Sequence, residues 1–293
     1  MRQLGRDRVG LGWRPELAAG IFDALDRIDV LEVVADNYLE ANRAQRQGLN
    51  LMAQHAAVHL HCIDLGLAGA EEVATARLER VARLVDDVKP EGWSDHLAFV
   101  RAGGIEIGHL AAPPRTEQSV ENAARNVRKA ARIVGSMPAM ENIATLIEPP
   151  GSTLSEPDWI SRIIAQTGCG LLLDVHNFYA NGVNFGTDPL HFLDAIPLDS
   201  IACLHIAGGR WITSPDGAKP YLLDDHLHAV TEPVYALLAE VAARAAQPLT
   251  VILERDGEYP DMPVLLEELD RARAALAQGR ARIAAQPERA DAG

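Results

Sequence analysis

The chain lacks the features that mark several common classes of protein. Its 293 residues contain no apolar run near the roughly 20 residues that a membrane helix needs. Cysteine is scarce: Cys62, Cys169 and Cys203 form no C-x-x-C pair, and their odd number excludes a framework in which every cysteine is paired. Residues 1–10 carry arginines but no apolar stretch typical of a secretory signal. We therefore expect a soluble cytoplasmic protein with no membrane segment.

Basic and aromatic side chains are also scarce. Lys and Arg number 27 against 41 Asp and Glu, which gives a formal net charge of −14 at pH 7, and aromatic residues make up 5% of the chain. Proteins that bind nucleic acids neutralise phosphates with basic side chains and often stack aromatic rings on the bases. Nucleic acid is therefore excluded as an expected partner.

Short β-rich runs that alternate with helical stretches are the main feature that is present. The runs occupy residues 9–13, 30–35, 57–63, 92–99, 137–143, 170–175, 201–206 and 249–253. The helical stretches occupy residues 15–27, 71–88, 117–135, 156–166, 232–246 and 262–278. This alternation predicts parallel strands joined by helical crossovers, and eight strands indicate closure into a single (β/α)₈ TIM barrel of the α/β class.

The domain organisation follows from the same reading. No linker rich in Gly, Ser or Pro divides the chain, so we expect one barrel domain over residues 1–278. Residues 279–293 are rich in Ala, Arg and Glu and contain no strand pattern, which favours a frayed helix end and a disordered tail.

Polar side chains fall near the C-terminal ends of the predicted strands, where TIM barrels carry their active sites. Six strands end on His61, His96, Glu141, Asp174, His205 or Glu254, and Asn177, Asp224 and His226 follow in adjoining segments. Each alone is more often a helix cap or an ordinary hydrogen-bonding residue. Together, carboxylates crowded on one rim would repel each other unless cations lay between them.

These nine donors predict a metal site. Imidazole, carboxylate and amide ligands without thiolate suit Fe(II), Mn(II) or Zn(II), and nine donors exceed what one ion can use, so we expect two or three ions. For Asp224 and His226 to reach the metals, the long loop over residues 207–230 must fold across the mouth of the barrel.

Other polar residues receive more ordinary interpretations. His59 shares a face with His61 one layer deeper, so we expect it in the core or behind the ligands. We expect Asn142 and Asp95 to support the histidines, and the three cysteines to serve in packing. Exposed or capping positions are expected for His55, His109, His191 and His228, whereas His176 is left open.

In its sequence motifs, the chain resembles the family of multinuclear non-haem iron enzymes that modify cysteine in ribosomally made peptides, whose best-known type makes the oxazolone and thioamide of methanobactin. The resemblance runs from Val9 to about Asp270. Its motifs are LEVVADNY (31–38), HCIDLG (61–66), SDHLA (94–98), EN (141–142), LLDVHN (172–177), HIAG (205–208), DDH (224–226) and ILERD (252–256).

The resemblance implies a xylose-isomerase-like TIM barrel with iron at the nine donors named above. It further implies two or three irons in mixed valence, O₂ as co-substrate, a Cys-containing precursor peptide and often a small partner protein that delivers it. Products of this chemistry include oxazolone with thioamide, or thiooxazole. Asp256, two residues after Glu254, is expected near the metals as a proton acceptor. Two positions depart from the family pattern: Cys62 replaces a usual Gly, and Asp36 replaces a frequent Glu before Asn37.

Two alternatives remain open from the residues. A divalent-metal sugar isomerase or phosphodiesterase holds metal ions on a similar rim of the same barrel, and these ions act as Lewis acids. The net charge opposes the phosphodiesterase, and the presence of only three lysines, Lys89, Lys129 and Lys219, gives no obvious catalytic lysine for the isomerase. A non-catalytic protein that binds metal or peptide is the other alternative.

Overall fold

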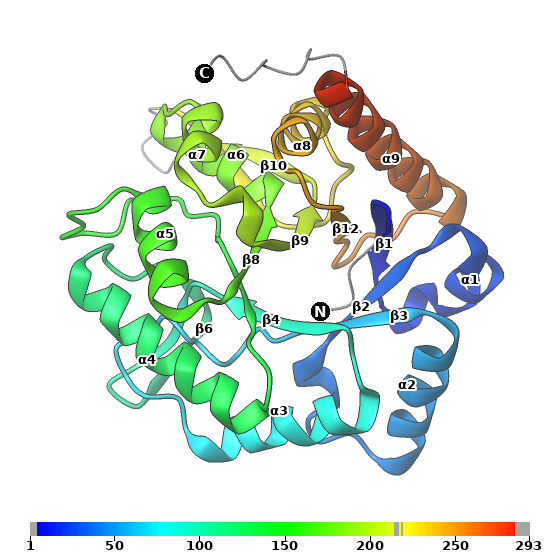
Figure 1. Cartoon of the computed structure of the whole chain (residues 1–293), viewed down its shortest axis with the longest axis horizontal. Helices are drawn as coiled ribbons and strands as arrows, with labels where there is room; N and C mark the ends of the chain where they lie inside the picture. Colours follow the sequence, from blue (N-terminus) through cyan, green and yellow to red (C-terminus); the bar gives the residue numbers. More distant parts are fainter. Residues whose placement is uncertain (1–4, 214–216, 218, 285–293) are drawn as a thin grey trace, which may run out of the picture.

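The computed structural model describes residues 5–213, 217 and 219–284. Within these residues, eight parallel strands close into a barrel in the order β1-β12-β9-β8-β7-β4-β3-β2, which confirms the predicted TIM barrel (Figure 1). The barrel strands are β1 (Arg8–Gly12), β2 (Val30–Val34), β3 (Ala57–His61), β4 (Gly92–His96), β7 (Ala139–Glu141), β8 (Gly170–Asp174), β9 (Ile201–Ile206) and β12 (Thr250–Leu253).

Helices surround the barrel on its outside (Figure 1). They are α1 (Ala18–Asp23), α2 (Arg43–His55), α3 (Thr75–Val88), α4 (Glu117–Val134), α5 (Glu156–Thr167), α6 (Val175–Phe185), α7 (Pro189–Ala195), α8 (Glu232–Arg244) and α9 (Met262–Ala284). Side chains cap several N-termini: Asn42 accepts from the amide of Gln45, and Thr116 from the amide of Ser119. Among the described residues, no helix is both long and apolar enough to cross a membrane.

Several expectations about elements were wrong in detail. Residues 15–27 form α1 flanked by 3₁₀ turns at Pro15–Leu17 and Leu25–Arg27, because Gly20 weakens the middle and no side chain caps α1. The helix expected from residue 71 begins at Thr75. Helices α2, α6 and α7 were not anticipated, nor were the hairpins β5–β6 (Phe99–Ala102, Ile105–Ala111) and β10–β11 (Gly209–Thr213, Pro220–Asp224).

Helix α9 also runs past the expected domain end at residue 278, as far as Ala284. The physical reason is a set of hydrogen bonds from the Arg280 guanidinium, which reaches the Asp7 carboxylate at 2.8 Å and the backbone oxygen of Gln247 at 2.6 Å. These contacts hold the last turns of the helix against the barrel. The rest of the expected tail, residues 285–293, lies outside the described residues.

The barrel interior is layered because side chains alternate along each strand. Val30, Leu172, Cys203 and Ile252 form a small apolar cluster. Two residues after each of these four come Glu32, Asp174, His205 and Glu254, all of them buried. The polar layer at the C-terminal end therefore rests on an apolar floor.

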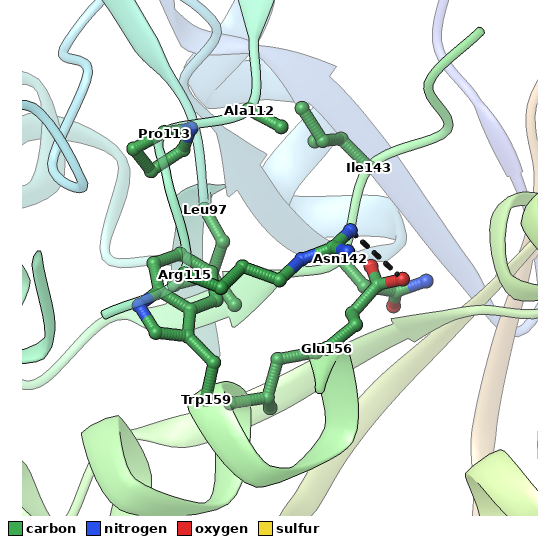
Figure 2. A pocket seen from close by; sticks show the side chains of 9 residues that line it. Leu97, Ala112, Pro113, Arg115, Asn142, Ile143, Glu156 and Trp159 are labelled. Atoms are coloured by element: carbon green, nitrogen blue, oxygen red, sulfur yellow. Dashed lines mark ion pairs between the residues drawn. The ribbon is translucent and has the colours of Figure 1, made fainter. Parts of the chain in front are cut away.

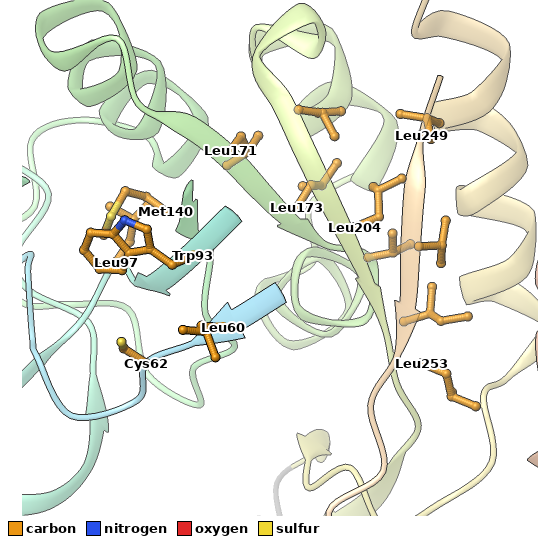
Figure 3. Close-up of a cluster of buried hydrophobic side chains, with 14 of the residues drawn as sticks. Leu60, Cys62, Trp93, Leu97, Met140, Leu171, Leu173, Leu204, Leu249 and Leu253 are labelled. Carbon is orange, nitrogen blue, oxygen red and sulfur yellow. The ribbon is translucent and has the colours of Figure 1, made fainter. Parts of the chain in front are cut away.

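The intervening residues point outward and hold the helices to the barrel. Leu60, Leu171, Leu173, Leu204 and Leu253 belong to the large cluster of buried side chains between strands and helices (Figure 3). Full burial of each such leucine stabilises the fold by roughly 1.5–3 kcal/mol. Each ligand candidate at a strand end is thus preceded or followed by a residue that anchors its strand.

Candidate metal centre

Six of the predicted ligands form two adjoining groups at the C-terminal end of the barrel. His61, His96 and Glu141 offer one donor atom each within 4.8 Å of one another, and so do Glu141, Asp174, His205 and Glu254. Glu141 belongs to both groups. A carboxylate has two oxygens, so Glu141 is placed to serve two ions at once.

The first group is built from two imidazoles around one carboxylate oxygen. The Nε2 atoms of His61 and His96 are 3.3 Å apart, and each lies 3.3 Å from Oε2 of Glu141. Donors about 2.0–2.2 Å from one ion are separated by distances of this order, so the group fits a transition metal. Burial, and then the neighbouring imidazoles of His96 and His205, lowers the pKa of His61 well below its usual value, which keeps a lone pair available.

The second group places His205 among carboxylates. Its Nδ1 lies 3.1 Å from Glu254 and 3.4 Å from Glu141. Burial acts to lower the pKa of His205, but the charges of Glu254, Glu32 and Glu141 raise it well above the usual value. For Asp174, burial and then the nearby Asp224 and Glu141 raise the pKa well above its usual value. The site therefore favours added positive charge, which a proton or a metal ion supplies.

The remaining three predicted ligands lie beside the second group. Asp224 Oδ1 is 2.8 Å from Nε2 of His226, and Nδ1 of His226 is 3.4 Å from Glu254. Neither Asp224 Oδ1 nor His226 Nε2 has a hydrogen-bond partner among the described residues despite this proximity, as expected for two donors that face a common ion. The backbone of His226 has a φ of 54°, which is unfavourable for any residue other than glycine. Such strained residues cluster at functional sites.

Asp174 and Asn177 are joined through the start of α6. One oxygen of Asp174 accepts from the amide of Asn177 at 2.7 Å and so caps the helix, while Oδ2 has no partner among the described residues. The side-chain nitrogen of Asn177 donates to the backbone oxygen of Asn142 at 3.0 Å, which leaves its Oδ1 without a partner in the same part of the chain. Both residues thus keep one oxygen for a cation.

The loop expected over the mouth does bring Asp224 and His226 to the cluster. Its described residues form the hairpin β10–β11, in which Gly209 is the register partner of Asp224. The amide of His226 donates to the backbone oxygen of Gly208, and the amide of Asp256 donates to the backbone oxygen of His226. These bonds tie the hairpin to the end of β12.

The residues that support the ligands differ from those expected. His61 Nδ1 lies 2.8 Å from the hydroxyl of Ser94, the neighbour of Asp95. Asp95 itself accepts from the amide of Leu67 on the outer side of β4, because alternation turns it away from the barrel interior. Asn142 does support a ligand, although not a histidine: its side chain exchanges hydrogen bonds with the backbone of Asp174.

Glu32 is a site residue that the sequence reading missed. Its carboxylate is buried at 3% exposure and lies 2.9 Å from Nε2 of His205. By accepting from Nε2, Glu32 fixes the ring so that Nδ1 faces Glu141 and Glu254. The available signal was a lone carboxylate inside the apolar run VLEVV, at a position that alternation turns into the barrel.

Asp256 lies at the edge of the cluster, with its side chain 45% exposed. Its Oδ2 is 3.1 Å from Nδ1 of His226, and Arg14 forms an ion pair with its other oxygen. Burial acts to raise the pKa of Asp256, but the hydrogen bond from His226 and the charges of His226 and Arg14 bring it below the usual value. The side chain is therefore a carboxylate at neutral pH.

An ion pair and several hydrogen bonds support the segment that contains Asn142 (Figure 2). Arg115 and Glu156 form a buried ion pair of 3.1 Å beside a cavity of about 10 Å³, which is room for about one water molecule. Glu156 also accepts from Asn181, whose side chain binds the backbone of Ile143 and Thr145. This network fixes the chain just after Glu141.

The other histidines lie away from the two donor groups. His59 faces the opposite end of the barrel, where its Nε2 is 4.0 Å from Glu91 and burial lowers its pKa to about 4. His55, His109 and His191 are exposed as expected, although His109 lies in strand β6 instead of a loop or helix, since the β5–β6 hairpin was not anticipated. His228 binds Asp225 at 3.0 Å. His176 is fully buried beside Asp224.

The cysteines lie outside both donor groups, as predicted. Cys62 and Cys169 pack in the large cluster between strands and helices, and Cys203 packs in the apolar floor. Burial raises the pKa of Cys62 well above its usual value, so this side chain is a thiol at a packing position. The other departure, Asp36, accepts from the amide of Ile63 at 2.8 Å.

Comparisons with known proteins agree with this architecture. Residues 8–277 match the family model described as RiPP precursor modification enzyme MbnB/TglH/ChrH. A UPF0276 protein of Streptomyces avermitilis is 37% identical over 286 residues, which cover 94% of this chain and 56% of the relative, so the chain spans about half of that protein's length. A UPF0276 protein of Caulobacter vibrioides is 30% identical over 275 residues, covering 94% of this chain and 96% of the relative.

Solved structures show the same fold at low sequence identity. Endonuclease IV from Thermus thermophilus is 16% identical with a TM-score of 0.60, covering 92% of this chain and 99% of that one. L-ribulose 3-epimerase is 15% identical with a TM-score of 0.60, covering 96% of this chain and 99% of that one. Fold and cluster together define a xylose-isomerase-like TIM barrel whose mouth carries groups of side chains able to hold metal ions. Within that class, the chain belongs to the family of RiPP precursor modification enzymes, which act on ribosomally made peptides.

Proposed function

We propose that this protein is a multinuclear non-haem iron oxidase that uses O₂ to modify cysteine in a ribosomally made precursor peptide. The observation that carries the proposal is Glu141, which is shared between a group with two histidines and a group with one histidine and two further carboxylates. Such nitrogen and oxygen donors suit a redox metal that keeps positions open for other ligands. Bound iron would supply the electron transfer between the cysteine residue and O₂.

The mouth of the barrel has features that support a peptide substrate. Apolar side chains are exposed on segments that follow barrel strands at their C-terminal ends: Ile63 at 42%, Ile147 at 70% and Trp211 at 57%. These side chains are candidate contacts for the apolar side chains of a peptide. A small partner protein that delivers the peptide belongs to the same proposal.

We assign proton transfer to Asp256. Its half-exposed carboxylate is accessible to a substrate at the mouth, and the hydrogen bond with His226 keeps it beside the cluster. A carboxylate there accepts the proton that a cysteine thiol or backbone amide of the substrate releases. Arg14, paired with Asp256, holds the carboxylate in this place.

The test is co-expression of the chain with Cys-containing peptides encoded beside its gene, with and without any small neighbouring protein. Mass spectrometry should show a mass shift in the peptide that requires both iron and oxygen. His96→Ala should abolish the shift, whereas His109→Ala, an exposed histidine outside the site, should retain it. A shift that persists without oxygen, or that zinc-loaded protein produces equally, would favour a Lewis-acid enzyme. Tight peptide binding without any shift would indicate a non-catalytic binding protein.

Asp256→Asn separates the two roles that this residue can have. Because Asp256 is proposed as a proton acceptor and not as a ligand, the variant should keep the metal content of the wild type and modify the peptide more slowly. Elemental analysis and the rate of peptide conversion are the two measurements. Loss of metal in the variant would place Asp256 among the ligands instead.

A further inference from the structure

His176 is a buried imidazole beside the nine candidate ligands and is not one of them. Its side chain is 0% exposed, and neither ring nitrogen has a hydrogen-bond partner among the described residues. Buried polar groups are almost always paired, because an unpaired one forfeits its hydrogen bonds to water. An imidazole in this position therefore needs a partner that the described side chains and backbone do not provide.

The ring of His176 faces Asp224 and His226, the two candidate ligands that the hairpin and the segment after it supply. Nε2 of His176 lies 3.7 Å from Oδ1 of Asp224, and that oxygen is itself 2.8 Å from His226. Two donors bound to one ion at about 2.0–2.2 Å lie at most about 4.4 Å apart, so 3.7 Å is compatible with a shared ion.

Gly209 in the hairpin β10–β11 has no side chain, which leaves space for the imidazole of His176. A Cβ atom at Gly209 would stand 2.6 Å from Nε2 of His176 and 2.2 Å from the backbone oxygen of Leu223. Gly209 is the register partner of Asp224, so the position without a side chain lies directly beside the carboxylate. The absence of a side chain at 209 is what lets the imidazole approach Asp224.

We propose that His176 is a tenth donor of the metal centre and binds, through Nε2, the ion that Asp224 and His226 hold. This inference rests on the proposed metal centre and adds a ligand to it. His176 and Asn177 come from α6, whereas Asp224 comes from β11. The ion therefore links helix to hairpin and fastens the hairpin over the mouth of the barrel.

The metal content of a His176→Gln variant tests the assignment. Glutamine retains a polar side chain of similar reach, so the fold should persist while the imidazole ligand is lost. Removal of a residue that merely supports a ligand weakens metal binding by about 10–100-fold, and loss of a ligand should do at least as much. Elemental analysis of protein purified without air should give one ion fewer per chain than the wild type. His228→Gln is the matched control and should keep every ion, because this histidine lies in the segment after β11 and binds Asp225 instead of facing the cluster.

A second measurement follows the hairpin directly. In wild-type protein, added Fe(II) should slow amide hydrogen exchange over residues 209–213 and 220–224, and in His176→Gln this protection should be lost. His176→Asn provides a second variant if the first does not fold, and the melting temperature of the metal-free forms checks folding. Equal metal content and equal protection in variant and wild type would overturn the assignment of His176 alone. A wild-type protein that binds no metal would overturn the proposed function and this inference together.

Discussion

At the residue scale, the ability of each histidine to bind a metal ion in the candidate centre depends on which ring nitrogen faces the cluster. His205 has Nε2 bound by Glu32 at 2.9 Å, so only Nδ1 can face Glu254 and Glu141. His61 is turned the other way, with Nδ1 beside Ser94 and Nε2 facing His96 and Glu141. Partners behind the two rings therefore determine which nitrogen is offered to a metal.

Replacing Glu32 should weaken metal binding without removing a ligand. The carboxylate of Glu32 orients the ring of His205, and its charge makes the imidazole a better electron donor. Glu32→Gln keeps a side chain of the same size beside His205 but removes that charge. We expect metal affinity to fall by about 10–100-fold, measured by titration of metal-free protein with Fe(II) without air. Glu91→Gln, at the opposite end of the barrel, is the control and should bind as the wild type does. Unchanged affinity in Glu32→Gln would show that His205 needs no partner to bind metal.

At the element scale, close packing of α8 against α9 depends on one glycine. A Cβ atom at Gly279 would stand 2.3 Å from the backbone oxygen of Ala239 and 2.6 Å from Cβ of Ala242. In α2, by contrast, a Cβ at Gly48 would meet nothing within 4 Å. The same substitution should therefore have opposite effects in the two helices.

Gly279→Ala should lower the free energy of unfolding by about 1–3 kcal/mol, because the helices must move apart. Gly48→Ala should raise it by about 0.5–1 kcal/mol, because alanine favours the helix and the space is open. Urea unfolding of the two variants beside the wild type measures both changes. Stabilisation by both substitutions would show that α8 and α9 have room to accept a methyl group between them.

The link between α9 and the start of the barrel should depend on pH. Burial acts to raise the pKa of Asp7, but the hydrogen bonds and charge of Arg280 and the amide of Leu249 bring it below the usual value. A carboxyl with a lowered pKa stabilises the folded state above the pKa of the unfolded chain, about 3.9, and this contribution is lost as the pH falls through the folded pKa.

Asp7→Asn should therefore lower the free energy of unfolding by about 1–2 kcal/mol at pH 7, since charged hydrogen bonds are lost. The difference from the wild type should shrink as the pH falls below about 4. Urea unfolding over a series of pH values gives both quantities, with Asp23→Asn at an exposed site as the control. A difference that stays constant with pH would mean that the charge of Asp7 contributes nothing.

At the scale of the whole molecule, the metal centre concentrates negative charge inside a protein whose formal net charge is already −14. Glu32, Glu141, Asp174 and Glu254 are all buried in the mouth of the barrel. Cations bound there would offset this repulsion, so the proposed metal binding would be coupled to folding. Binding to the folded state alone adds about 2.7 kcal/mol of stability when the free metal exceeds its Kd a hundredfold.

Removal of metal should therefore lower the melting temperature. Protein prepared without air should melt at a lower temperature after treatment with a chelator, and added Fe(II) should restore the original value. The same treatment of Asp174→Ala should cause a smaller change, because that variant holds less metal from the start. A melting temperature that does not respond to chelator or metal in the wild type would contradict metal binding at this centre.

All eight barrel strands could be predicted, because buried parallel strands are apolar runs with polar residues near their C-terminal ends. His61, Glu141, Asp174 and His205 were identified by that rule, and the structure brings them together. Asp224 and His226 were named as donors in the long loop after His205, and that loop was expected to fold over the mouth so that they could reach the cluster. The hairpins β5–β6 and β10–β11 could not be predicted, because short antiparallel pairs on a barrel rim depend on packing against neighbouring helices more than on periodicity.

The sequence by itself determined the closed barrel and the location of the donors, because strand alternation and the common direction of parallel strands leave little freedom at the C-terminal rim. Only the tertiary structure decided which residues stand behind the ligands. Glu32 and Ser94 face inward on strands far from His205 or His61 along the chain, and His176 meets Asp224 only because the hairpin folds against α6. Contacts of this kind join segments whose distance in sequence carries no information about their distance in space.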